Sequence, residues 1–204
     1  MGSDSSDREP RILAFAGSTR NGSYNKRLVR IAARGARQAG ARVTVADLAD
    51  FPMPLFDADL EARSGMPEPA ARFKRLMVES DGLLISSPEY NSSVTGVLKN
   101  AIDWASRREE GEPRLAAFAG KTAALMAASP GALGGLRGLV HLRAILGNLS
   151  VLVLPQQRAV SRAASAFTDD DELADEEEGE RIEGLGRRLA EVVAALHAAG
   201  VPSS

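Results

Sequence analysis

The sequence predicts a doubly wound α/β fold, in which helices cover both faces of a parallel sheet. The main observation is an alternation, because five short apolar segments are separated from one another by helical patterns. Alternation of this kind favours parallel strands joined by right-handed crossovers. The second observation is size, since 204 residues with 44% apolar content suit one domain with a sizeable core.

The predicted elements follow in order along the chain. Apolar runs predict five buried strands at residues 12–16, 43–46, 83–86, 122–127 and 151–154. Apolar residues spaced by three and four predict five helices at residues 25–39, 69–80, 96–107, 136–149 and 181–199. Five strands favour the flavodoxin-like order 2-1-3-4-5 over a six-stranded dinucleotide fold.

The remaining segments are predicted to be irregular. Residues 1–9 are polar and are expected to form a disordered tail, which leaves residues 10–200 as a single domain. Residues 53–66 lie among prolines and are predicted to be an irregular loop. Residues 169–180 contain nine acids and no base, and we interpret them as a solvated turn.

Composition excludes several kinds of chemistry. The absence of cysteine excludes disulfides, thiolate metal sites and cysteine nucleophiles, and only His141 and His197 are available for a histidine metal site. We therefore expect no metal. A formal net charge of −2 gives no reason to expect nucleic acid. No apolar stretch reaches the length of a membrane span, so a cytoplasmic protein is expected.

The loop after the first strand has the composition of an anion site. It reads GSTRNGSYN over residues 17–25 and leads directly into a helix, whose N-terminus offers free amides. Gly17 permits a tight turn, Arg20 offers a fork of donors, and residues 11–46 around them hold eight Lys or Arg and no acid. A phosphate ligand fits, although a serine cap after an ordinary turn would also give this pattern. Neither a dinucleotide fingerprint nor a P-loop is present, and the AGKT at residues 119–122 is interpreted as a turn.

A second polar loop follows the third predicted strand. Pro88 to Ser93 lie between that strand and a helix, at the edge of a parallel sheet where ligands bind. Pro88 stiffens the loop, Glu89 either caps or pairs with a cation, and Tyr90 is either a stacking ring or a surface tyrosine. On the helix that follows, Trp104 and its neighbours are expected to be structural.

Three stretches together resemble the NADPH-dependent FMN reductases, a family of flavodoxin-like fold that includes quinone, chromate and azo-dye reductases. The stretches are Gly17-Ser18-Thr19-Arg20 with Ser23 and Asn25, Pro88-Glu89-Tyr90-Asn91 with Leu98-Lys99-Asn100-Ala101-Ile102-Asp103-Trp104, and Ser129-Pro130-Gly131 with Gly134-Gly135-Leu136-Arg137. The similarity spans about residues 11–160. One departure is Thr95, where the family commonly has proline, and we expect its hydroxyl to cap the following helix.

The resemblance implies a role for each of these residues. The FMN phosphate would be bound by Ser18, Arg20, Ser23 and Asn25. The isoalloxazine ring would be lined by Pro88, Glu89, Tyr90, Asn91 and Ser92, and its far side closed by Ser129 and Gly131. Arg137 is a candidate for contact with NADPH or with another subunit, or is an ordinary surface arginine.

The predicted activity is an FMN-dependent oxidoreductase that takes hydride from NADPH or NADH and passes it to a flavin, quinone or similar small acceptor. Such chemistry needs no protein acid or base, so no catalytic side chain is assigned. The alternatives are a flavodoxin-type electron carrier or regulatory module, against which Arg20 argues, and a hydrolase or sugar-phosphate binder, which leaves the second loop unexplained. The resemblance also implies a homodimer or homotetramer. The helix at 136–149 has more apolar surface than one sheet face needs, and part of it is expected to face another subunit; its apolar side chains are Leu139, Leu142, Ile145, Leu146 and Leu149.

Overall fold

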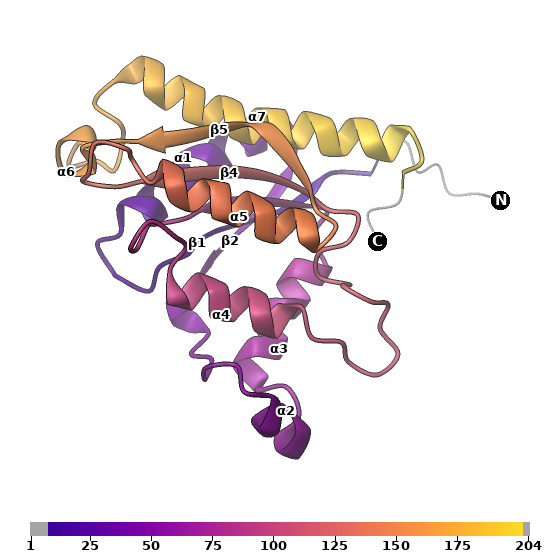
Figure 1. The fold of residues 1–204 in the computed structure, drawn as a ribbon. Helices are drawn as coiled ribbons and strands as arrows, with labels where there is room; N and C mark the ends of the chain where they lie inside the picture. The colour runs from indigo at the N-terminus through magenta and orange to yellow at the C-terminus, as the bar shows by residue number, and fades with distance from the viewer. Residues whose placement is uncertain (1–7, 202–204) are drawn as a thin grey trace.

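The computed structural model describes residues 8–201, which form a five-stranded parallel sheet between two layers of helices (Figure 1). The strands are β1 (Arg11–Ala16), β2 (Arg42–Asp47), β3 (Gly82–Ser86), β4 (Thr122–Ala128) and β5 (Leu152–Val160). Their order is β2-β1-β3-β4-β5, and every neighbouring pair is parallel. The predicted fold and strand order are confirmed.

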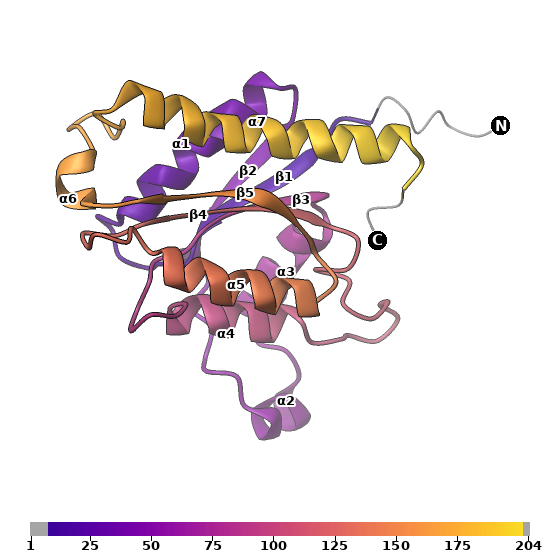
Figure 2. The ribbon, with the colours of Figure 1, turned by 45° about the horizontal axis from the view of Figure 1, so that its top comes forward.

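The helices divide between the two faces of the sheet. They are α1 (Tyr24–Gln38), α2 (Ala58–Ser64), α3 (Glu68–Val78), α4 (Gly96–Ala105), α5 (Leu136–Asn148), α6 (Ala163–Ala166) and α7 (Glu176–Ala198). Helices α1 and α7 cover one face, while α3, α4 and α5 cover the other (Figure 2). No helix in the described chain is both long and apolar enough to cross a membrane.

Strand β1 shows how the sequence builds both cores. Its alternate residues Ile12 and Ala14 face the core under α1 and α7, and Leu13 and Phe15 face the core under α3, α4 and α5. All four are at most 1% exposed. A central strand buried on both faces reads as a continuous apolar run rather than an alternating one, and that run is the signal from which the strand was predicted.

Three predicted segments differ clearly from the structure: one strand, one loop and one helix. Strand β5 continues past residue 154 to Val160, because an edge strand tolerates Pro155 at a point where the register with β4 shifts. The loop predicted at residues 53–66 contains α2, whose first turn is capped by the carboxylate of Asp57. Helix α7 begins at Glu176 rather than residue 181, with Asp175 as its cap.

The acidic segment is only partly a solvated turn. Most of its acids are exposed, but residues 176–180 form the start of α7. Two acids bind the basic face of α1, because Asp171 pairs with Arg27 at 2.6 Å and Glu172 pairs with Arg34. The contact with Glu172 raises the pKa of Arg34 above its ordinary value, although burial opposes the charge. The basic segment is thus largely neutralised by the chain itself.

The ends of the chain are only partly described. Residues 1–7 of the predicted tail lie outside the described residues. Arg8 is described, and its guanidinium donates to the buried carboxylate of Asp81 at 3.0 Å. Arg11 donates to the same carboxylate from its side chain and its backbone.

Candidate functional site

The loops after β1, β3 and β4 meet at the carboxyl edge of the sheet around a hollow of about 90 Å³. This is the edge at which open α/β sheets bind ligands. Its lining residues are Ser18, Arg20, Ser23, Tyr24, Asn25, Pro88, Glu89, Tyr90, Ala128, Ser129 and Pro130. Eight of the predicted site residues are therefore brought together, whereas Asn91, Ser92 and Gly131 lie in the same loops outside this lining. Tyr24 was not predicted.

The first loop holds its turn close to α4. A Cβ atom on Gly17 would lie 2.9 Å from the side chain of Leu98, so a larger residue would force the two segments apart. The amide of Gly17 donates to Ser86 O at 2.9 Å, which ties the loop to the end of β3. The sequence therefore needs glycine here for close packing.

The N-terminus of α1 points open donors at the hollow. Ser23 is the N-cap residue and is buried, yet its hydroxyl makes no capping hydrogen bond. Within residues 8–201, no acceptor is recorded for the amides of Tyr24 or Asn25. Free first-turn amides and the positive end of the helix dipole suit an anion.

Arg20 is the one cation in the lining of the hollow. Its guanidinium has no carboxylate partner in the described chain, and its recorded contact is with the Tyr24 ring, 5.8 Å from the centroid. Arg27 and Arg34 on the same side of the fold are already paired with acids. Arg20 is therefore the arginine available for a ligand in this hollow.

Asn25 has a structural duty that sequence reasoning missed. Its Oδ1 accepts from Ser86 Oγ at 2.8 Å and from the amide of Ala128 at 2.9 Å, and its Nδ2 donates to Ala128 O at 2.8 Å. These bonds join the ends of β3 and β4 below the hollow. One Nδ2 hydrogen and the backbone amide remain, so a phosphate contact by Asn25 stays a prediction.

The second loop is fastened to α5 by Glu89. Its carboxylate is 7% exposed and accepts from the guanidinium of Arg137 at 2.6 Å and from the amide of Gly138 at 3.0 Å. Burial raises the pKa of Glu89, but the hydrogen bonds from Gly138 and Arg137 outweigh it and leave the pKa below the ordinary value of 4.5. Glu89 is a charged anchor that both pairs with a cation and caps α5, the two roles considered from the sequence.

The tip of this loop is a tight turn. Tyr90 and Ser93 exchange two backbone hydrogen bonds of 3.0 Å, and Asn91 and Ser92 both have positive φ. The Tyr90 side chain is 60% exposed at the rim of the hollow. His141 of α5 contacts Ser93 Oγ at 2.9 Å and lies outside the lining. Arg137, engaged with Glu89, is also outside it, and its role toward NADPH stays a prediction.

Thr95 caps α4, as predicted. Its hydroxyl accepts from the amide of Leu98 at 3.2 Å and donates to Gly17 O at 2.7 Å. The second bond was not predicted, and it connects α4 to the anion loop. Farther along α4, Asn100 and Trp104 are structural as expected, because both donate to Pro54 O.

The third loop is compact because of two glycines. Gly134 and Gly135 have positive φ, and a Cβ atom on Gly134 would lie 2.7 Å from the backbone of Ala159. Ser129 Oγ accepts from the amide of Gly131 at 3.2 Å. The loop thereby closes one wall of the hollow and leads into α5.

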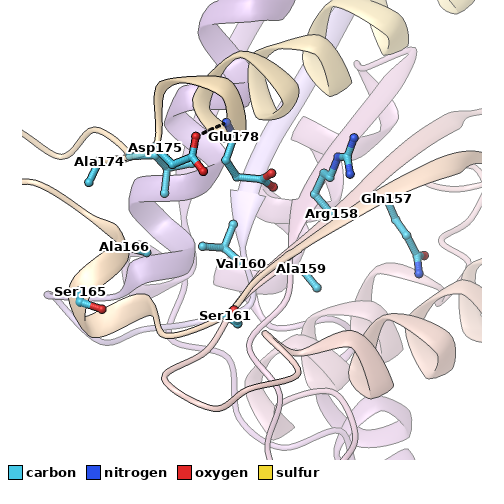
Figure 3. A pocket seen from close by; sticks show the side chains of 11 residues that line it. Gln157, Arg158, Ala159, Val160, Ser161, Ser165, Ala166, Ala174, Asp175 and Glu178 are labelled. Atoms are coloured by element: carbon cyan, nitrogen blue, oxygen red, sulfur yellow. Dashed lines mark hydrogen bonds between the residues drawn. The ribbon is translucent and has the colours of Figure 1, made fainter.

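A larger hollow of about 490 Å³ lies between β5 and the start of α7 (Figure 3). Arg158 and Glu178 face into it, and none of the predicted site residues lines it. Volume favours this second hollow, but chemistry favours the first. We give more weight to chemistry, because the start of α7 at the larger hollow is capped by the Asp175 carboxylate and carries acids in its first turn, which disfavours an anion. The smaller hollow instead combines the uncapped, acid-free first turn of α1 with Arg20.

Comparison with known proteins identifies the family of the chain. The sequence profile described as NADPH-dependent FMN reductase matches residues 10–165. The chain belongs to this family. Residues 10–165 include all three loops around the hollow, so the resemblance inferred from the loop motifs is confirmed.

The chain is similar to several proteins named as reductases or oxidoreductases. An NAD(P)H-dependent FMN reductase of Pseudomonas aeruginosa is 39% identical over 174 residues, which are 85% of this chain and 89% of that protein. An NAD(P)H:quinone oxidoreductase of Solanum tuberosum is 34% identical over 180 residues, covering 86% of this chain and 88% of that protein. The structure of FerB, a flavoenzyme NAD(P)H:(acceptor) oxidoreductase from Paracoccus denitrificans, matches with a TM-score of 0.75 and 26% identity, covering 91% of this chain and 98% of that chain.

Proposed function

We propose that the protein binds one FMN per chain at the 90 Å³ hollow and acts as an NAD(P)H-dependent oxidoreductase. The electron acceptor would be a flavin, a quinone or a similar small molecule. The observation that supports this most is the unpaired guanidinium of Arg20 beside the free first-turn amides of α1. One anion site suits the single phosphate of FMN, and no second phosphate-binding motif occurs in the sequence.

The residues around the hollow fit this cofactor. Ser18, Ser23 and Arg20 would hold the phosphate, together with the backbone of Asn25. The loop of Pro88 to Ser92 would lie along the ring, with Ser129 and Gly131 on its far side. FMN, when bound, supplies the hydride and electron transfer itself. The protein would bind and orient it, and the carboxylate of Glu89 is occupied by α5 rather than free to move a proton.

The main alternative is an electron carrier without reductase activity. A carrier would oxidise almost no NADPH unless a separate reductase were added. The test is NADPH oxidation by the purified protein with FMN and a quinone present, compared with the same mixture lacking FMN. We expect turnover that requires FMN. A protein that binds FMN but does not oxidise NADPH would be a carrier, and this proposal would be wrong.

A second copy of the chain is proposed to complete the site. A hollow of about 90 Å³ is smaller than the roughly 300–1,000 Å³ typical of ligand pockets, so much of a flavin would lie on open surface. Exposed apolar side chains gather on the same loops and on α5. They are Tyr90 at 60%, Leu133 at 51%, Leu136 at 43% and Val140 at 58% exposure. A homodimer, or a tetramer built from it, would cover this surface.

Three of the five side chains considered for the contact cannot lie there. Leu139, Leu142 and Leu146 are fully buried in the core of their own chain, because they form the inner face of α5, whereas Ile145 and Leu149 are half-buried. Light scattering over a dilution series tests the assembly. A fully active species of 21.5 kDa, the mass of one chain, would contradict it.

The proposed activity also bears on localisation. Because NADPH is an intracellular donor, we propose that the protein acts in the cytoplasm.

A further inference from the structure

The aromatic rings of Tyr24 and Phe167 stack on each other next to the anion loop. The Tyr24 ring lines the hollow, and the Arg20 guanidinium lies 5.8 Å from its centroid. The Tyr24 ring also stacks on Phe167, with centroids 5.7 Å apart and planes 15° apart. The Arg27 guanidinium covers Phe167 at 4.7 Å. Cation, ring, ring and cation therefore form one continuous series from the hollow to the segment before α7.

The segment that holds Phe167 is fixed to α1. Arg27 Nε lies 2.6 Å from Asp171, and its guanidinium also donates to Thr168 O. The segment is closed on itself as well, since Thr168 N donates to Glu172 O at 2.8 Å and Phe167 forms a bridge with Leu173. Phe167 is thus held in place by ion pairs and by backbone bonds.

The other side of this segment faces the larger hollow. Ala166 and Leu173, which flank the turn around Phe167, line that space. Ser165 and Ala166 belong to α6 (Figure 3). Phe167 itself lines neither hollow. Its position is therefore explained by the Tyr24 ring and by Arg27, not by contact with a ligand.

We propose that Phe167 is a positioning residue for the FMN phosphate, acting through Tyr24 on Arg20. This inference rests on the proposed function. Stacking on Phe167 fixes the orientation of the Tyr24 ring. The face of this ring then holds the Arg20 guanidinium in position before the phosphate binds. An arginine confined in this way loses fewer conformations when it binds an anion, so the affinity for the phosphate is higher.

The test compares FMN with riboflavin, which has the same ring and no phosphate. Both are titrated into the wild type, Phe167→Ala and Phe167→Tyr. We expect Phe167→Ala to weaken FMN binding about three- to tenfold and to leave riboflavin binding unchanged, because only the phosphate anchor is affected. Phe167→Tyr keeps the stacked ring and should bind FMN as tightly as the wild type. If Phe167→Ala fails to fold, Phe167→Leu takes its place, since leucine keeps apolar volume but removes the stacked ring.

A double-mutant cycle separates positioning from general loosening. In an Arg20→Ala background, Phe167→Ala should cause no further loss of FMN affinity, because the residue through which it acts is absent. Phe56→Ala is the matched control, since Phe56 also pairs with an aromatic ring and an arginine, Trp104 and Arg107, in the opposite helix layer. It should leave FMN affinity unchanged.

Two results would overturn the inference while the proposed function stands. One is a wild type that binds FMN and a Phe167→Ala variant that binds it equally well. The other is an equal loss of FMN and riboflavin affinity, which would mean that the variant loosens the whole site. A wild type that binds no FMN at all would remove both the inference and the proposed function.

Discussion

The Glu89 carboxylate and the Arg137 guanidinium are 2.6 Å apart and join the loop after β3 to the first turn of α5. The same carboxylate accepts from Gly138 N, so a single side chain both pairs with a cation and caps a helix. The loop that would hold the flavin ring is therefore fixed by the helix at whose surface a second subunit is proposed to bind.

Glu89→Gln should lower the free energy of unfolding by about 1–2 kcal/mol, because a charge-assisted cap becomes a neutral one. Glu177→Gln is the control, since Glu177 pairs with Arg181 while 71% exposed, and it should change stability by less than about 0.5 kcal/mol. Urea unfolding at pH 7 measures both. Equal effects of the two substitutions would contradict the anchoring role.

The same comparison should depend on pH. Glu89 has a folded-state pKa below its ordinary value of 4.5, so its contribution is complete above that value. As pH falls below 4.5 and through the folded-state pKa, the carboxylate is protonated and the contribution is lost. The stability gap between the wild type and Glu89→Gln should therefore shrink in acid. A gap that stays constant from pH 7 to pH 3 would be inconsistent with the ion pair.

Thr95→Ala should destabilise the protein by about 1–2 kcal/mol, since it removes the cap on α4 and the bond to Gly17 O. Thr95→Ser keeps both bonds and should be close to the wild type. Thr95→Pro restores the residue common in the family but loses the hydroxyl, so it should also weaken the tie to the anion loop. Thermal unfolding ranks the three variants, and a Thr95→Ser variant as unstable as Thr95→Ala would show that the hydroxyl is unimportant.

Gly186→Ala should destabilise the protein by about 3 kcal/mol or more, because helices α1 and α7 touch through their backbones. A Cβ atom on Gly186 would lie 1.8 Å from Ala32 O, and one on Gly35 would lie 2.0 Å from Glu183 O. Gly184→Ala is the control in the same helix, where no atom lies within 4 Å. It should be neutral or stabilise by up to about 1 kcal/mol through helix propensity. Denaturant unfolding of both variants decides it, and similar stabilities would contradict the close contact.

Because of Lys121, the free energy of unfolding should increase as the pH rises above about 8. Its side chain is fully buried, and burial, together with Arg11, lowers its pKa to about 8 although Asp81 opposes this. Between pH 8 and the ordinary value of 10.5, the unfolded chain keeps a proton that the folded chain has lost, so folding is favoured as pH rises. Relative to Lys121→Met, the wild type should gain roughly 3 kcal/mol across this range. A pH-independent difference would mean that Lys121 titrates normally.

Much of the fold was predictable because its signals are local. The alternation of apolar runs and helical patterns indicated a parallel sheet, and the count of five strands favoured the order that is observed. Thr95 was correctly expected to cap α4. Glycine and hydroxyl residues located the loops at the sheet edge. The last strand was predicted to end at residue 154, just before Pro155. It continues to Val160, because proline is excluded from a central strand but not from an edge strand.

The contacts that were missed join residues far apart in the chain. Asn25 joins the ends of β3 and β4, and Tyr24 stacks on Phe167, and neither partner is indicated by its sequence neighbourhood. One signal was available. The basic residues at 11–46 and the acids at 169–180 are complementary in charge, which indicates pairing between the segments, as Arg27 with Asp171 and Arg34 with Glu172 show.

The central claim, that the hollow beside Arg20 holds the FMN phosphate, is tested most directly by titrating FMN into the wild type and Arg20→Ala and following the visible spectrum. The exposed Arg75 on α3 supplies the control Arg75→Ala. We expect one FMN per chain, a loss of about ten- to a hundredfold in affinity for Arg20→Ala, no loss for Arg75→Ala, and weaker binding of FAD than of FMN. Unchanged FMN affinity in Arg20→Ala, or FAD binding as tight as FMN, would contradict the claim.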